Sequence, residues 1–254
     1  MNFLKGKKIL ISGMLNRFSI SYGIAKKMYK YGAELAFTYQ NNKFKKKILK
    51  LAKKFNSEII IPCDVRFDKN IYKLFKKLSI HWKKFDGLVH SIAFAPSLQL
   101  QGDYLDCITK ESFKITHDIT SYSFVAMIKA CKHMLNINSS ILTISFIGSK
   151  KFIPNYNIMG LAKASLEANV RYIAQSVGKN NIRVNAISSG PIKTISSLSI
   201  KNFKNFLNCY KKNNILKKKI TIYDIGNVAS FLCSNLSFGI TGQVIFVDGG
   251  WNII

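Results

Sequence analysis

Short runs of apolar residues alternate with longer segments of mixed apolar and polar residues over almost the whole chain. The apolar runs have the length and composition of buried parallel strands. Seven strands are predicted, at about residues 8–12, 34–39, 59–61, 87–91, 141–146, 182–188 and 244–247.

The segments between these runs predict helices. They are expected at about residues 14–31, from the end of the second strand to about 55, at 70–82, at 121–135, over a segment that contains residues 156–163, and at 225–232. This alternation predicts an α/β fold, a Rossmann-like doubly wound sheet of seven parallel strands with right-handed crossovers. No repeat or linker interrupts it, so residues 1–254 are expected to form a single domain.

The first strand is followed by a turn that suits a phosphate group. The pattern Gly13-x5-Ser19-x3-Gly23 leads from the strand end into a helix. Ligands of such sheets bind beyond the carboxyl ends of the strands, and a helix N-terminus favours a pyrophosphate. Because the pattern differs from Gly-x-Gly-x-x-Gly, it is weak evidence alone.

The acid that normally binds the adenine ribose at the end of the second strand is missing. The chain has residues 38–41 as Thr-Tyr-Gln-Asn, with Lys43 close by, so this rule does not decide between NADH and NADPH. Asp64 follows the third strand and is well placed for an adenine amino group. Helix N-capping explains Asp64 nearly as well.

Tyr156 and Lys163 lie seven residues apart. On an α-helix seven steps turn about 700° and rise roughly 10 Å, so both side chains would leave one face, and Pro154 suits the start of such a helix. A phenol there can donate a hydrogen bond to an oxygen that gains negative charge, and the lysine can stabilise that charge and hold a cofactor sugar. A surface tyrosine and a solvated lysine are the alternative.

The formal net charge is +27 and the sequence pI is about 9.9. A nucleic-acid or anionic-membrane binder and a solvated lysine coat both explain such a charge. Lysines occur in every amphipathic segment and no basic stripe with interleaved aromatics stands out. The charge therefore favours a lysine coat, with one exception near Lys201, and no nucleic acid is expected as a partner.

Five widely spaced cysteines without a Cys-x-x-Cys pattern are typical of free thiols in a reducing compartment. No disulfide and no metal site is expected. The N-terminus lacks the apolar region of a signal peptide, and the least charged stretch, residues 225–247, is interrupted by polar residues and glycines. We expect a cytoplasmic protein without membrane insertion.

Several motifs together resemble the NADH-dependent, FabI-type enoyl-acyl-carrier-protein reductases of the short-chain dehydrogenase/reductase superfamily. The resemblance covers about residues 3–251. The discriminating detail is the seven-residue spacing from Tyr156 to Lys163, where ordinary short-chain dehydrogenases have four. The motifs are Gly13-x5-Ser19, Tyr39-Gln40, Cys63-Asp64-Val65, the segment from His90 to Pro96, Tyr156-x6-Lys163, the segment from Ala186 to Thr194, and Val247-Asp248-Gly249-Gly250.

The resemblance implies NADH as the cofactor. Lys163 would bond the nicotinamide ribose. The other residues implied to line the cofactor pocket are Gly13, Ser19, Ile20, Gln40, Asp64, Val65, Ile92, Ile192, Lys193, Thr194, Ile195 and Ser196.

The resemblance also implies the substrate, a trans-2-enoyl chain on acyl carrier protein in type II fatty-acid elongation, and a homotetramer. Hydride would reach the β-carbon, Tyr156 would donate to the thioester oxygen of the enolate, and Ala95 would contact the acyl chain. Residues 194–207 would form a lid. Lys201 and Lys204 would meet the carrier protein, although one more lysine-coated helix explains them about equally well.

Two positions depart from the family pattern. Phe146 stands where the family usually has a second tyrosine, so a proton-donating role there is lost. Ala93 stands where glycine is usual, and its methyl group would tighten the nicotinamide pocket or have no effect.

Two alternatives to enoyl reduction follow from these features. One is a 3-ketoacyl or other carbonyl reductase of the same superfamily, which the seven-residue spacing disfavours. The other is a basic nucleic-acid-binding protein without catalysis, which would use the net charge and the loss of the second tyrosine.

Overall fold

Seven parallel strands form one sheet in the order β3-β2-β1-β4-β5-β6-β7. The computed structural model describes residues 2–254, so residue 1 of the predicted domain lies outside the described part. The chain runs outward in one direction from β1 and in the other from the adjacent β4, so the carboxyl ends of these two paired strands mark the switch point of the fold. The strands are β1 (Lys8–Ser12), β2 (Glu34–Tyr39), β3 (Ile60–Pro62), β4 (Phe85–His90), β5 (Leu135–Phe146), β6 (Arg183–Ser189) and β7 (Val244–Val247).

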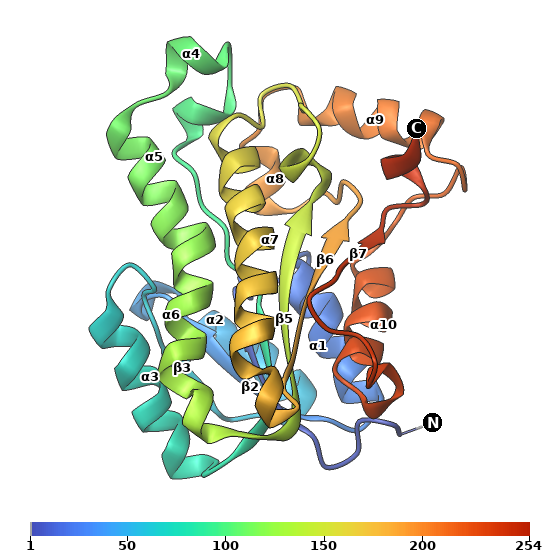
Figure 1. Cartoon of the computed structure of the whole chain (residues 1–254). Coiled ribbons are helices and arrows are strands. Elements are labelled where there is room, and N and C mark those ends of the chain that lie inside the picture. Colours follow the sequence, from blue (N-terminus) through green and yellow to red (C-terminus); the bar gives the residue numbers. More distant parts are fainter. Residues whose placement is uncertain (1) are drawn as a thin grey trace.

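Helices cover both faces of the sheet (Figure 1). The face with α3, α6 and α7 buries Leu10 of β1, and the face with α1, α2 and α10 buries the adjacent Ile9 and Ile11. This alternation confirms the predicted α/β, doubly wound, single-domain fold. The helices are α1 (Ile20–Lys30), α2 (Asn42–Ala52), α3 (Asp68–His81), α4 (Tyr104–Cys107), α5 (Lys110–His117), α6 (Ser123–Cys131), α7 (Ile158–Val177), α8 (Ile195–Leu198), α9 (Phe203–Asn213) and α10 (Ile222–Leu232).

The predicted helix at 121–135 ends earlier than expected, because α6 stops at Cys131 and Leu135 already belongs to β5. It is also part of a longer helical rod. α5 and α6 are joined by a π-helical turn at Asp118–Tyr122, and the rod begins at Lys110. Extra residues in a π-turn shift the register of the helix faces, so one uninterrupted period could not reveal the whole rod.

The predicted helical position of Tyr156 is wrong. α7 begins at Ile158, and Tyr156 lies in the turn before it. Asn155 and Asn157 on either side have φ of 61° and 39°, values that a right-handed helix cannot include. The seven-residue spacing therefore does not place the two side chains by helical periodicity.

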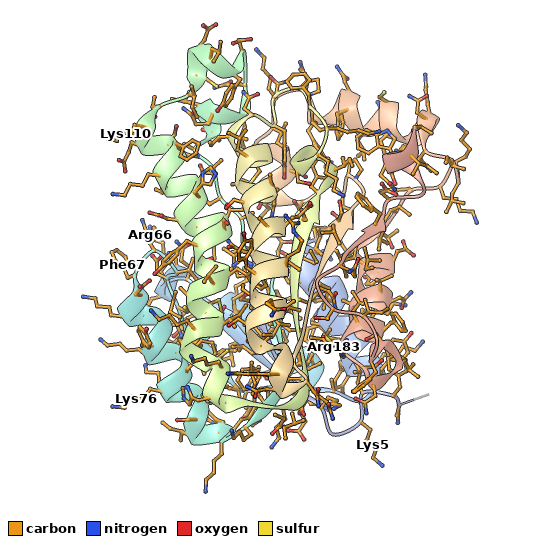
Figure 2. All side chains as sticks on the ribbon, viewed as in Figure 1. Lys5, Arg66, Phe67, Lys76, Lys110 and Arg183 are labelled. Atoms are coloured by element: carbon orange, nitrogen blue, oxygen red, sulfur yellow. The ribbon has the colours of Figure 1, made fainter. Side chains whose placement is uncertain are left out.

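The lysine coat is visible as long side chains that leave the ribbon at the periphery, with Lys5, Lys76 and Lys110 labelled (Figure 2). Arg183 is different, because it is buried and donates to the backbone oxygens of Leu232 (2.8 Å) and Ser234 (2.9 Å). No helix within residues 2–254 is both long enough and apolar enough to cross a membrane.

Candidate active site

The turn after β1 closes against the turn after β4. Gly13 has φ of 85°, and a Cβ atom there would overlap the carbonyl oxygen of Ser91. Only glycine tolerates both the left-handed backbone and this close approach. In doubly wound folds a dinucleotide binds in the crevice beyond the carboxyl ends of the strands at the switch point, and at Gly13 this place presents backbone without a side chain.

Ser19 shapes the loop that leads from this turn into α1. Its Oγ accepts from the N–H groups of Leu15 and Asn16, each at 3.1 Å, and makes no capping bond to the helix. The first N–H groups of a helix have no partner within it, so those of Ile20 and Ser21 are available to an anion. Serine in this position leaves the helix N-terminus open.

Gln40 and Asp64 meet at the ends of β2 and β3. The Asp64 carboxylate accepts from the Arg66 guanidinium, with an Nη2–Oδ2 distance of 2.6 Å. Hydrogen bonds from Arg66, and next its positive charge, hold the pKa of Asp64 below its usual range, and the Gln40 side chain adds a smaller effect in the same direction. Phe67 is the N-cap residue of α3, so the alternative that Asp64 caps this helix is wrong. Val65 is buried beside them.

Tyr156 is buried within a small apolar cluster above the carboxyl end of the sheet. Its ring packs edge-to-face on Phe146, with centroids 4.9 Å apart, and lies against the backbone of Gly148. Burial, and next the carboxylate of Glu167, raise the pKa of the phenol. Tyr156 thus stays protonated and can act as a hydrogen-bond donor.

Lys163 is buried on α7, and its Nζ donates to the carbonyl oxygen of Ile144 at 2.7 Å. Burial lowers the pKa of Lys163 to about 8, and the charge of Glu167 opposes this effect. Lysine has three donors, so two remain for a cofactor. The structure thus excludes the alternative of a surface tyrosine and a solvated lysine.

His90 ends β4 and is neutral, because burial, and next the charge of Lys163, lower its pKa to about 3. Its ring nitrogens face Thr143 Oγ1 at 3.1 Å and Ser123 Oγ at 2.8 Å. The His90 ring therefore fixes the end of β4, two residues before Ile92. The methyl group of Ala93 is exposed, so it makes no crowded contact here.

Ala95 is buried in the same apolar cluster as Tyr156. The loop that leads to it is fixed at Phe94, whose N–H donates to Thr120 Oγ1 at 3.1 Å. Thr120 belongs to the π-helical turn, so the irregular part of the α5–α6 rod supports the loop of the predicted substrate site.

The segment from Ile192 to Ser196 runs from the end of β6 into α8. Ile192 is buried, and Thr194 caps α8 by accepting from the N–H of Ser197. Lys193 and Ile195 have exposed side chains.

Helices α8 and α9 then lie near the arrowheads of β5 and β6, at the carboxyl end of the sheet (Figure 1). The N–H of Lys201 donates to Leu100 O at 3.0 Å, and Asn155 Nδ2 donates to Lys201 O at 3.3 Å. The Phe206 ring packs on Phe146 with centroids 6.2 Å apart. The segment predicted to be a lid is therefore in contact with the Tyr156 region.

The structure brings these predicted residues to one edge of the sheet, and comparison with known proteins names the family. A model described as enoyl-(acyl carrier protein) reductase matches residues 13–252. The chain is 58% identical over 253 residues to the NADH-dependent enoyl-acyl-carrier-protein reductase FabI of Buchnera aphidicola subsp. Acyrthosiphon pisum, covering 100% of this chain and 97% of that protein. The chain belongs to the enoyl-acyl-carrier-protein reductase family.

Crystal structures of other family members agree with this assignment. The enoyl-acyl-carrier-protein reductase (NADH) of Aquifex aeolicus VF5 superimposes with a TM-score of 0.97 at 43% identity, over 99% of this chain and 98% of that chain. The reductase of Anaplasma phagocytophilum, in complex with NAD, gives a TM-score of 0.94 at 37% identity, over 99% of this chain and 94% of that chain.

In this family member, sequence reasoning missed two charged residues of the site. Arg66 pairs with Asp64 two residues away, and Glu167 lies one helical turn after Lys163. The i, i+4 spacing of Lys163 and Glu167 could have drawn attention to the second acid.

Proposed function

We propose that the chain reduces the trans-2 double bond of enoyl chains carried on acyl carrier protein, with NADH, during type II fatty-acid elongation. The observation that carries the proposal is the buried pair of Tyr156 and Lys163 beside the switch-point crevice, in a chain 58% identical to a FabI reductase. The reductases in the comparison carry this activity in their names.

The crevice fits NADH by its chemistry. Gly13 leaves room for a pyrophosphate, the N-terminus of α1 with Ser19 and Ile20 offers donors, and Asp64 can accept from an adenine amino group. Lys163 would hold the nicotinamide ribose. The remaining lining would come from Gln40, Val65, Ile92, Ile192, Lys193, Thr194, Ile195 and Ser196. When bound, NADH supplies the hydride.

Tyr156 would act on the other reactant. As the β-carbon of the substrate is reduced, negative charge develops on the thioester oxygen. The protonated Tyr156 phenol donates a hydrogen bond to that oxygen, an interaction worth about 3 kcal/mol in a transition state. Ala95 would contact the acyl chain from the adjacent loop.

A side-by-side assay separates this activity from carbonyl reduction. We expect the purified protein to oxidise NADH with a crotonyl thioester and to leave an acetoacetyl thioester unchanged. Turnover of the acetoacetyl thioester alone would favour the 3-ketoacyl reductase. Strong DNA binding at physiological salt without NADH binding would favour the basic nucleic-acid-binding protein.

Phe146→Tyr tests whether the reaction needs a second phenol. The Phe146 ring is half-buried among Tyr156, Phe206 and Trp251. Because hydride transfer and enolate stabilisation require one donor, we expect kcat with a crotonyl thioester to change by less than about threefold, as for a substitution that leaves the transition-state contact in place. A rise of about 100-fold would mean that the missing phenol limits this enzyme.

We assign residues 194–207 as a lid over the substrate. Within this lid, Lys201 and Lys204 would contact the acyl carrier protein. Both lysines are exposed on the outer side of that segment. We expect Lys201→Glu with Lys204→Glu to lower kcat/KM for a carrier-protein thioester about 10-fold at low salt and to spare a crotonyl pantetheine thioester, because rim charges steer association.

The matched control is Lys73→Glu with Lys76→Glu on α3, which makes the same change of charge at exposed positions far from the lid. Equal losses in both double variants would mean that the lysines near the lid belong to the general coat. Added salt should narrow the difference between the two variants.

We also assign a homotetramer and a cytoplasmic location. Large apolar side chains are exposed on several elements, including Phe152 (83%), Tyr172 (78%) and Ile253 (74%), as expected for surfaces that another copy covers. The cysteines Cys63, Cys131 and Cys233 are free and buried, which suits a reducing compartment.

A further inference from the structure

Glu167 is a buried acid on α7, 4% exposed, that lies one turn after Lys163. Its Oε1 accepts from Ser145 Oγ at 2.5 Å and from Ser149 Oγ at 2.7 Å. Within residues 2–254 no lysine or arginine nitrogen approaches its carboxylate to 4.0 Å. Burying a carboxylate without a direct ion pair costs folding free energy, and such groups are often found at functional sites. The position of Glu167 beside Lys163 therefore indicates a functional role.

The two serines flank the turn at the end of β5. Ser145 is the last but one residue of the strand, and Ser149 ends the short helix that follows. One carboxylate oxygen therefore holds both ends of the segment Phe146-Ile147-Gly148. Helix α7 is tied to the same strand by Lys163, which donates to the carbonyl oxygen of Ile144.

This turn is the surface on which the Tyr156 ring rests. Phe146 contacts the ring edge-to-face, and a Cβ atom on Gly148 would overlap the ring. A Cβ atom on Gly160 would lie 2.6 Å from Gly148 O, so the turn is also close-packed on α7. Because these contacts leave little free space, a shift of the turn would move the phenol.

Glu167 also balances the charge of Lys163. Its carboxylate favours the protonated lysine and opposes the burial that lowers the pKa to about 8. The other ionisable group whose pKa responds to Lys163 is His90, which is neutral with a pKa of about 3. Tyr156 is protonated, and its pKa responds to Glu167. Arg171 donates to the backbone oxygen of Glu167 and not to its carboxylate.

We infer that Glu167 is a positioning residue, which fixes the strand-end turn under the Tyr156 ring and supplies the negative charge that faces Lys163. The inference rests on the proposed function, because it concerns the two side chains that act on the thioester and on NADH. Its two parts are separable, since the serine hydroxyls hold the turn and the carboxylate supplies the charge.

Ser149→Ala tests the turn. It removes one anchor and leaves the carboxylate in place, so we expect kcat with a crotonyl thioester to fall about 10-fold while the NADH Kd changes by less than about twofold, because small displacements of a reacting group lower kcat. Ser149→Thr keeps the hydroxyl and should restore kcat. Ser165→Ala is the matched control, because Ser165 lies on α7 near Glu167 but its hydroxyl is hydrogen-bonded to Ser121 (2.8 Å) and not to the Glu167 carboxylate.

Glu167→Gln tests the charge. The amide oxygen can still accept from both serines, so we expect kcat at pH 7 to stay within about threefold of wild type. Without the carboxylate the pKa of Lys163 falls further, so NADH affinity should begin to decline about one pH unit lower than in wild type.

Wild-type kcat in Ser149→Ala would overturn the role in the turn, and an unchanged pH profile in Glu167→Gln would overturn the role of the charge. A general loss of stability would lower the melting temperature of both variants. It would not lower kcat in Ser149→Ala alone and shift the pH profile of NADH binding in Glu167→Gln alone. If the wild-type protein failed to reduce crotonyl thioesters, the proposed function would fail and this inference with it. An active wild type with unaffected variants would overturn the inference alone.

Discussion

Tyr156→Phe is expected to lower kcat for a crotonyl thioester by about 100-fold or more, while the Kd for NADH changes by less than about twofold. The phenol is the group that donates to the thioester oxygen, and its raised pKa keeps it a donor at neutral pH. Phe146 offers no second phenol beside it. Phenylalanine has nearly the same shape, so the buried ring should keep its packing on Phe146 and Gly148.

Single-turnover and steady-state kinetics measure the loss, and titration with NADH measures the affinity. Tyr31→Phe is the control, because it removes a phenol that bonds Asn227 (3.3 Å) outside the site and should leave kcat unchanged. Equal turnover of Tyr156→Phe and wild type would remove Tyr156 from the mechanism. A parallel loss of NADH binding would mean that the substitution disturbs the whole crevice.

Lys163→Met is expected to weaken NADH binding by about 10-fold to 100-fold, the usual effect of losing one charge-assisted hydrogen bond. Methionine fills a similar volume on α7 and has no ammonium group. The loss should appear in the Kd for NADH, because the lysine is assigned to the nicotinamide ribose. The variant also leaves Ile144 O without its donor, so the melting temperature should be measured alongside.

The affinity of the wild type for NADH should also depend on pH. Lys163 loses its proton near pH 8 instead of near its ordinary pKa of 10.5, so affinity should be constant at lower pH and decline as the pH rises through about 8. The profile of Lys163→Met should be flat over that range. A wild-type affinity that holds to pH 10 would show that the charged lysine does not bind the cofactor.

The lowered pKa of Lys163 weakens NADH binding at high pH, but the stability of the folded protein without NADH should rise over the same pH range. Between about pH 8 and pH 10.5 the folded protein binds fewer protons at Lys163 than the unfolded chain does. The contribution of Lys163 to the free energy of unfolding in the absence of NADH should therefore rise with pH in this window.

The predictable part of the fold was the part with a regular pattern. Each of the seven apolar runs overlaps one of the seven strands, and Lys8–Ser12, Glu34–Tyr39 and Val244–Val247 were placed to the residue. The prediction for β5 was too short, because this strand begins at Leu135 and not at residue 141. The glycine turn at Gly13 could also be predicted, because close approach and a positive φ both require glycine.

The features that could not be predicted from the sequence, the position of Tyr156 and the hydrogen bonds of Glu167, depend on irregular backbone and on tertiary contacts. Two asparagines with positive φ place Tyr156 before α7, although a helical pattern continues through them. Asparagine tolerates the left-handed region, so the Asn155-Tyr156-Asn157 triplet was a sign that could have been weighed. The link from Glu167 to Ser145 and Ser149 spans about twenty residues and joins two elements, so no local pattern indicates it.

The destination of the hydride tests the central claim most directly. The protein would be incubated with a crotonyl thioester and NADH that carries deuterium at the transferable position, and the product analysed by NMR and mass spectrometry. We expect a butyryl thioester with one deuterium, at the β-carbon. Deuterium on a former carbonyl carbon, or a product without label, would contradict enoyl reduction.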